Sequence, residues 1–192
     1  MSDTPSTPTR TIDGQVLPET GTFKADPTHS ILGFSVRHMM IAKVRGRFTT
    51  FDATLVVADD PLQSTLTVEV DLASVDTRDD QRDGHLRSPD FFDVETYPKM
   101  TYRSTGVTQL GDATVKIDGE LDLHGITRLL SLEAVYEGVG TDPWGGQRVG
   151  FSAIGELDRE DFDLTWNQPL ATGGVLVGKQ VRLEIETEFV RQ

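Results

Sequence analysis

The chain has 192 residues and a formal net charge of −13 at pH 7, because 31 Asp and Glu outnumber 18 Lys and Arg. This surplus of negative charge argues against nucleic acid, and against an anionic membrane surface as the main partner, since both would repel it. Cysteine is absent, which excludes disulfides, thiol catalysis and cysteine-ligated metals. The length and the ordinary globular composition predict one domain with a sizeable core.

The first twenty residues are rich in proline, threonine and serine. We expect residues 1–20 to form a flexible N-terminal arm, followed by a barrel domain over residues 21–192. The arm contains no apolar run that could serve as the core of an export signal. No later segment approaches the roughly 18 apolar residues of a membrane span. The sequence therefore predicts a soluble, cytoplasmic protein without a membrane span.

Alternation of apolar and polar residues is the dominant pattern along the chain. Such alternation is typical of a strand with one buried and one exposed face. The clearest examples are residues 65–72, 116–123, 130–136 and 181–189. A less regular form of the pattern covers residues 32–38, 44–57, 97–109 and 148–157. Together these segments predict about eight strands.

Two local signals interrupt the alternation. The parity of the apolar residues changes near Thr49-Thr50, which predicts a bulge or bend in a long strand. Thr77 and Asp80 have the spacing of a capping box, and Pro89 follows a charged stretch, which together predict a short inserted helix. Long strands favour a closed antiparallel barrel, because closure removes exposed edges. A barrel of about eight strands either fills with its own side chains or holds one small ligand.

The sequence shows no established motif for catalysis, for metal binding or for a nucleotide loop. The four histidines are not spaced like local metal ligands; they are His29, His38, His85 and His124. We therefore predict no catalytic residue, no metal and no cofactor. His38 shares a strand face with Phe34 and Val36, so it is either a half-buried histidine near the barrel rim or a polar group at a cavity.

Several short strings, which occur together and in order, resemble the YceI-like family of lipocalin-like, polyisoprenoid-binding proteins. The most specific are HLRSPDFFDV at residues 85–94 and LDLHGITR at residues 121–128. The others lie at residues 26–30, 34–38, 44–48, 97–98, 119–121 and 159–162. The resemblance covers about residues 22–190. One departure is Asp163, which stands where the family often has glycine.

The resemblance implies an all-β fold, namely an eight-stranded antiparallel lipocalin-like barrel with a short inserted helix. It also implies a function: binding a long-chain isoprenoid lipid, of the polyprenyl or isoprenoid quinone type, in the apolar interior, as a carrier or a store. The resemblance implies no enzymatic activity, and it allows a homodimer, since members of the family often pair. Many members of the family are exported, whereas this sequence shows no export signal.

The inward face of the expected strands supplies the candidate ligand site. The expected ligand-binding residues are Phe34, Val36, His38, Phe48, Val68, Val70, Tyr102, Leu121, Leu123, Leu132 and Phe151. His38, Tyr102 and the region of Arg103 or Arg128 are the expected partners of the polar end of the ligand. For each apolar residue, ordinary core packing is the alternative.

Two other functions stay open at this point. One is a barrel with a packed interior that acts as a structural, interaction or stress-related protein. The other is a lipid-modifying enzyme that uses His38 or an aspartate as its base.

Overall fold

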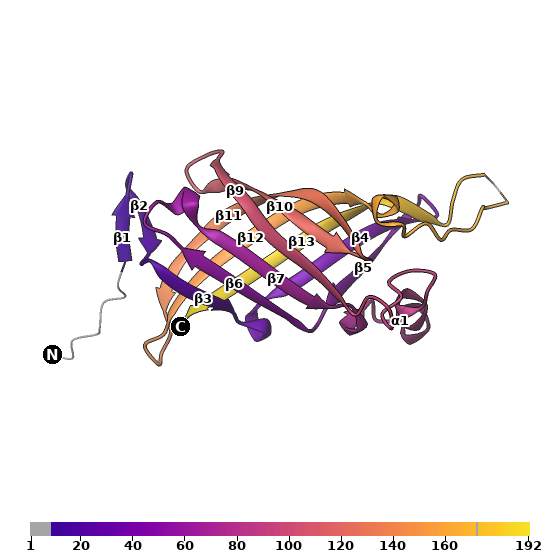
Figure 1. Cartoon of the computed structure of the whole chain (residues 1–192), viewed down its shortest axis with the longest axis horizontal. Helices are drawn as coiled ribbons and strands as arrows, with labels where there is room; N and C mark the ends of the chain where they lie inside the picture. Colours follow the sequence, from indigo (N-terminus) through magenta and orange to yellow (C-terminus); the bar gives the residue numbers. More distant parts are fainter. Residues whose placement is uncertain (1–8, 172) are drawn as a thin grey trace.

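The computed structural model describes residues 9–171 and 173–192, and its strands wind into a tilted barrel with α1 beside one end (Figure 1). The first strands are β1 (Thr9–Ile12), β2 (Gln15–Pro18), β3 (Gly21–Ala25), β4 (Ile31–His38), β5 (Ala42–Phe48), β6 (Phe51–Val57), β7 (Thr65–Asp71) and β8 (Val75–Asp76). After α1 (Asp80–Arg87) come β9 (Lys99–Gln109), β10 (Thr114–Leu123), β11 (Ile126–Thr141), β12 (Gln147–Asp158) and β13 (Val177–Arg191). Short 3-10 turns cover Pro27–His29, Pro61–Gln63, Leu72–Ser74 and Arg159–Phe162.

The barrel is closed by antiparallel pairing around its whole circumference. The strands follow one another in the order β12-β11-β10-β9-β7-β6-β3-β13, and β13 pairs with β12 to complete the ring. Toward the end that carries α1, β4, β5 and β8 continue the wall, because β13 pairs with β3 near its C-terminus and with β4 along its N-terminal half. The predicted eight-stranded antiparallel barrel with an inserted helix is confirmed.

The predicted irregularity near Thr49-Thr50 is also confirmed, and it divides the expected long strand into β5 and β6. Phe48 ends β5 and Phe51 begins β6, and both side chains are buried in the same core cluster. The two threonines between them hold the bend, because Thr49 N donates to Ser74 O at 3.2 Å and Thr50 O accepts from Asp71 N at 3.0 Å. The bend therefore lets two residues of opposite parity both face the interior.

The inserted helix starts later than the sequence predicts. Asp79, not Thr77, is the N-cap, and its carboxylate accepts from Arg82 N at 3.0 Å. Thr77 is buried instead and donates through its backbone N and its hydroxyl to Asp83, at 2.9 and 2.5 Å. The predicted capping pair is thus wrong, because a buried partner engages Thr77. Within the described residues, no helix is long and apolar enough to cross a membrane.

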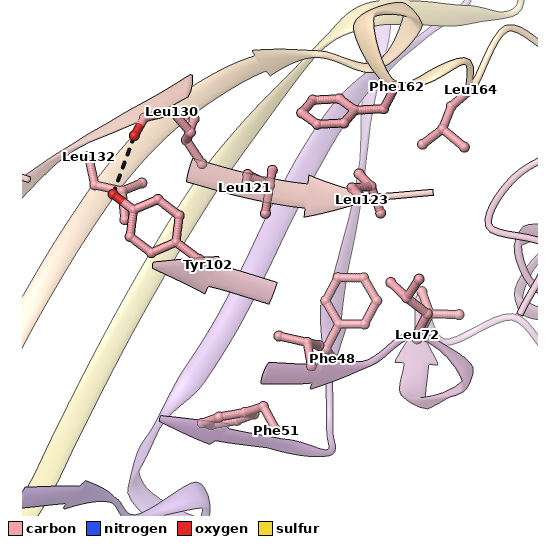
Figure 2. Packing of buried hydrophobic residues seen from close by; sticks show 12 residues of the cluster. Phe48, Phe51, Leu72, Tyr102, Leu121, Leu123, Leu130, Leu132, Phe162 and Leu164 are labelled. Atoms are coloured by element: carbon pink, nitrogen blue, oxygen red, sulfur yellow. Dashed lines mark hydrogen bonds between the residues drawn. The ribbon is translucent and has the colours of Figure 1, made fainter. Parts of the chain in front are cut away.

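The barrel end beside α1 is filled by apolar side chains. Leu72, Val75 and Phe162 are 0%, 1% and 2% exposed. Figure 2 shows the rings of Phe48 and Phe162 on opposite sides of Leu123, all directed toward the same core. We call this region the plug. It closes one end of the barrel by ordinary core packing.

The turn that carries Phe162 is fixed by a buried arginine. Arg159 is 3% exposed, and its guanidinium donates to Gly178 O at 2.9 Å and to Leu164 O. Burial lowers the pKa of Arg159 from its ordinary value. Asp163 ends the turn with φ +61°, a left-handed conformation that glycine adopts at least cost. This conformation gives a physical reason for a glycine at that position in related sequences.

Arg148 on β12 forms ion pairs across the interruption between β3 and β4. Its guanidinium donates to Asp26 and Asp142, each at 2.9 Å, and to Glu188 on β13. The pKa of Asp26 lies well below its ordinary value, first because the Thr28 hydroxyl donates to its carboxylate and then because Arg148 does. The same contacts raise the pKa of Arg148. This ion-pair network stabilises the wall where regular strand pairing is interrupted.

Gly119 on β10 packs so closely against Tyr102 and Arg103 on β9 that a larger side chain at this position should destabilise the fold. A Cβ there would overlap the ring of Tyr102 and lie 2.7 Å from Arg103 O. We expect Gly119→Ala to lower the free energy of unfolding by about 1–3 kcal/mol in urea denaturation. Gly106→Ala is the control. Gly106 on β9 lies opposite Asp118 on β10, and a Cβ at Gly106 would meet no atom within 4 Å. Equal stability of the two variants would contradict this packing.

The Arg148 network makes stability depend on pH in a defined direction. Asp26→Asn should lower the free energy of unfolding at pH 7 by about 1–2 kcal/mol, because charge-assisted hydrogen bonds are lost. Since folding lowers the pKa of Asp26, its contribution is complete above the ordinary pKa and disappears as the pH falls below it. The difference between wild type and variant, measured by urea denaturation, should therefore shrink below pH 4. The exposed pair of Asp52 with Lys24 supplies the control, and Asp52→Asn should change little. A difference independent of pH would contradict the account.

Candidate functional site

Beyond the plug, the barrel encloses a cavity of about 1080 Å³. Small-molecule sites in proteins have volumes of roughly 300–1,000 Å³, so this cavity is large for its class. Its wall follows the strand alternation: on β7 the alternate residues Leu66, Val68 and Val70 line it, together with Thr65 at the start of the strand. The interior of the barrel is therefore packed at one end and hollow over the rest.

Most residues expected at the site line this cavity. They are Phe34, Phe48, Val68, Val70, Tyr102, Leu121, Leu132 and Phe151. Val36, His38 and Leu123 do not line it: Leu123 belongs to the plug, and His38 ends β4 opposite Val177 and Ala42, at the plugged end. Contact of any of these residues with a ligand stays a prediction.

Two tyrosines place hydroxyl groups along the apolar wall. Tyr102 OH donates toward Ile117 O at 3.2 Å and Leu130 O at 3.3 Å, the second shown in Figure 2. Burial, with a smaller effect of Asp118, raises the pKa of Tyr102 to about 12. Burial also raises the pKa of Tyr136 to about 12. Both phenols are therefore neutral at physiological pH, and neither adds charge to the cavity.

The charged side chains that line the cavity are gathered at the end opposite α1. They are Arg10, Asp13, Asp60 and Asp112. They belong to the β1–β2 hairpin, the β6–β7 connection and the β9–β10 connection, which lie together at that end of the barrel (Figure 1). We call this end the mouth. The cavity thus has a polar mouth, an apolar wall and a plugged base. Arg103 and Arg128, considered as partners for a polar ligand end, are exposed and do not line it.

The β1–β2 hairpin lies across the mouth and is attached at two points. The Arg10 guanidinium donates to Ala58 O at 2.5 Å, Asp59 O at 2.6 Å and Pro18 O at 3.0 Å. The Tyr136 hydroxyl donates to Val16 O at 2.9 Å. The bonds to Ala58 and Asp59 and the bond from Tyr136 join the hairpin to the barrel rim on both sides of the opening, whereas the bond to Pro18 lies within the hairpin.

This hairpin is absent from the sequence-based prediction, although the sequence carries a signal for it. Asp13 and Gly14 have φ angles of +49° and +81°, as a two-residue hairpin turn requires, and Asp-Gly is a preferred pair there. The hairpin occupies residues 9–18 of the arm expected over residues 1–20. Residues 1–8 of that arm lie outside the described residues.

Three potential metal ligands meet on the barrel wall, away from the cavity. Atoms of Asp26, His29 and Glu188 lie within 4.8 Å of one another. Arg148 already donates to both carboxylates, so its guanidinium occupies the cation position of this group. The arrangement is that of a structural ion-pair network.

Comparisons with known proteins agree with this architecture. A family model described as YceI-like domain matches residues 23–189. A UPF0312 protein of Staphylococcus aureus is 37% identical over 170 residues, which cover 87% of this chain and 96% of that protein.

Two solved structures are similar in fold. The YceI protein of Campylobacter jejuni has a TM-score of 0.69 at 28% identity, covering 81% of this chain and 90% of that one. A protein of Saccharophagus degradans, named a polyisoprenoid binding domain implicated in plant cell wall breakdown, has a TM-score of 0.68 at 18% identity, covering 91% of this chain and 100% of that one. With the match of the family model over most of its length, this chain belongs to the YceI-like family.

Proposed function

We propose that the barrel binds a long-chain isoprenoid lipid in its cavity and serves as a carrier or store for it. The observation that carries this proposal is the cavity of about 1080 Å³, closed by the plug and lined by apolar side chains. The name of the Saccharophagus degradans protein, a polyisoprenoid binding domain, supports the same ligand class.

The physical basis is the removal of apolar surface from water. Each Å² of apolar surface that a ligand and the wall bury together contributes about 25 cal/mol, less the cost of ordering the ligand. An isoprenoid chain is apolar along its whole length, so it needs no specific polar partner inside the barrel. Its tail would lie toward the plug, and its polar end would lie at the mouth.

The charges at the mouth favour a ligand whose polar end is uncharged. Asp13, Asp60 and Asp112 place three carboxylates there against one cation, Arg10. The Arg10 guanidinium is engaged by three backbone carbonyls. A phosphate would therefore meet like charge, whereas an alcohol or a quinone would not. Within the isoprenoid class, this favours free polyprenols and isoprenoid quinones.

The two alternative functions find less support in the geometry. The best candidate for a catalytic base, His38, does not line the cavity and lies at the plugged end. The aspartates that do line the cavity lie at its mouth, away from the buried wall. A structural or interaction protein with a fully packed interior is also less supported, because only the plug is packed and the rest of the interior is hollow. Binding is therefore the function that the arrangement serves best.

Filling the cavity should abolish binding. Ala153 on β12 lines the cavity, whereas its neighbour Ile154 is 44% exposed on the outer face. We expect Ala153→Phe to reduce uptake of a long-chain polyprenol by delipidated protein at least tenfold, because the ring occupies ligand space. Uptake is measured by mass spectrometry of the extracted lipid. Ile154→Phe places the same ring on the outer face and should leave uptake unchanged, and circular dichroism checks both folds. Undiminished uptake by a folded Ala153→Phe variant would refute binding in the cavity.

Loosening the hairpin should accelerate release. Arg10→Ala removes the hydrogen bonds that hold the hairpin to the rim, so ligand exit should become about tenfold faster, which corresponds to about 1.4 kcal/mol of barrier. The rate is measured as transfer of a fluorescent polyprenol analogue to cyclodextrin. Arg128→Ala is the control, because Arg128 is exposed and bonds only Thr127 O among the described residues. If both variants release ligand at the wild-type rate, the hairpin does not limit exit.

A further inference from the structure

The loop that joins β4 to β5 exposes three consecutive apolar residues. Met39, Met40 and Ile41 are 39%, 59% and 79% exposed, at the plugged end of the barrel (Figure 1). Met39 and Met40 have φ angles of +51° and +61°, a region that disfavours large side chains. Met39 N donates to Leu176 O at 2.8 Å, which fixes this conformation. The fold thus holds large apolar side chains in solvent, in a conformation that costs stability.

The strands below this tip carry cations on their outer face. Arg37 lies opposite Lys43, Ser35 opposite Arg45, and Gly33 opposite Arg47. The four cations, Arg37, Lys43, Arg45 and Arg47, are exposed, and they alternate along their strands with Phe34 and Phe48, which line the cavity. The cationic tip is defined here as Arg37, Lys43, Arg45 and Arg47 together with residues 39–41.

In a chain of net charge −13, residues 31–51 contain the cations Arg37, Lys43, Arg45 and Arg47 but no Asp or Glu. Arg37 stands directly opposite Lys43, and like charges in that position destabilise a strand pair. An anionic partner would relieve this repulsion.

Three acidic residues on or beside the neighbouring strands form ion pairs, one of them with Arg47 of the tip. Asp76 on β8 pairs with Arg47 at 3.1 Å, and Glu184 on β13 pairs with Arg182 at 3.4 Å. Glu160 pairs with Lys179 at 2.6 Å. Among the residues that the structure describes, Arg37, Lys43 and Arg45 form no ion pair. Three cations thus remain available beside the apolar tip.

We propose that the cationic tip docks the barrel on an anionic phospholipid surface. Large apolar side chains that enter the lipid interface, flanked by cations that attract the head groups, are the combination that interfacial binding requires. A second copy of the chain is a poorer occupant, because two cationic tips would repel each other. Docking leaves the mouth directed away from the surface, and it goes beyond the proposed ligand binding, since no residue at 37 or 39–45 lines the cavity.

The test is co-sedimentation with vesicles of phosphatidylcholine alone or mixed with phosphatidylglycerol. We expect the full chain to bind the mixed vesicles at low salt, and to lose binding at least tenfold in phosphatidylcholine alone or at high salt. Arg37→Glu with Lys43→Glu, and separately Ile41→Ser, should each weaken binding at least tenfold.

Two control variants change an exposed apolar residue and an exposed cation that lie outside the cationic tip. Trp144→Ser deletes an apolar side chain that is 86% exposed on the β11–β12 turn, and Arg128→Glu reverses an exposed cation on β11. Both should bind within twofold of wild type. Polyprenol uptake by the tip variants should be unchanged, which shows that they fold and separates this test from that of the cavity. Failure of wild type to bind mixed vesicles, equal loss in the controls, or binding to an acidic protein but not to vesicles would overturn the proposal.

Discussion

Closure of the barrel directs every second side chain of eight strands inward, and these side chains fill only part of the space. Near α1, residues such as Leu72 and Phe162 complete a packed core. Beyond them the same alternation lines a cavity of about 1080 Å³. Water inside an apolar cavity finds few hydrogen-bond partners. The division between plug and cavity is therefore the basis of the proposal that the barrel binds an apolar, elongated ligand.

Alternation in the sequence predicts the strands well but not the volume that they enclose. The period of two reports a buried face, and this face is the same whether the space behind it is filled or hollow. Val36 and His38 continue the inward parity of Phe34, yet they lie beyond the cavity, at the plugged end. Leu123 is likewise inward but belongs to the plug. The extent of the plug depends on segments far apart in sequence, so parity alone could not locate it.

Local sequence signals mispredicted the start of the helix, because tertiary contacts determine which of two suitable residues caps it. Thr77 and Asp79 are both acceptable helix caps by residue type, and the buried partner Asp83 engages Thr77 instead. The Asp13-Gly14 turn lies in a segment whose prolines and threonines predict a flexible arm, although the turn pairs only strands that are adjacent in sequence. The net charge has a similar limit, because the value of −13 for the whole chain does not show that residues 31–51 contain cations but no Asp or Glu. Averages over a chain do not reveal how its surface is divided.

Native mass spectrometry of protein purified without detergent tests the central claim most directly. The account predicts a mass above the 21.2 kDa of the bare chain, by the mass of an extractable isoprenoid without a phosphate group. Such a ligand would match both the apolar wall and the acidic mouth. The bare mass in every preparation from cells that contain isoprenoid lipids, together with no uptake of added polyprenol, would contradict it.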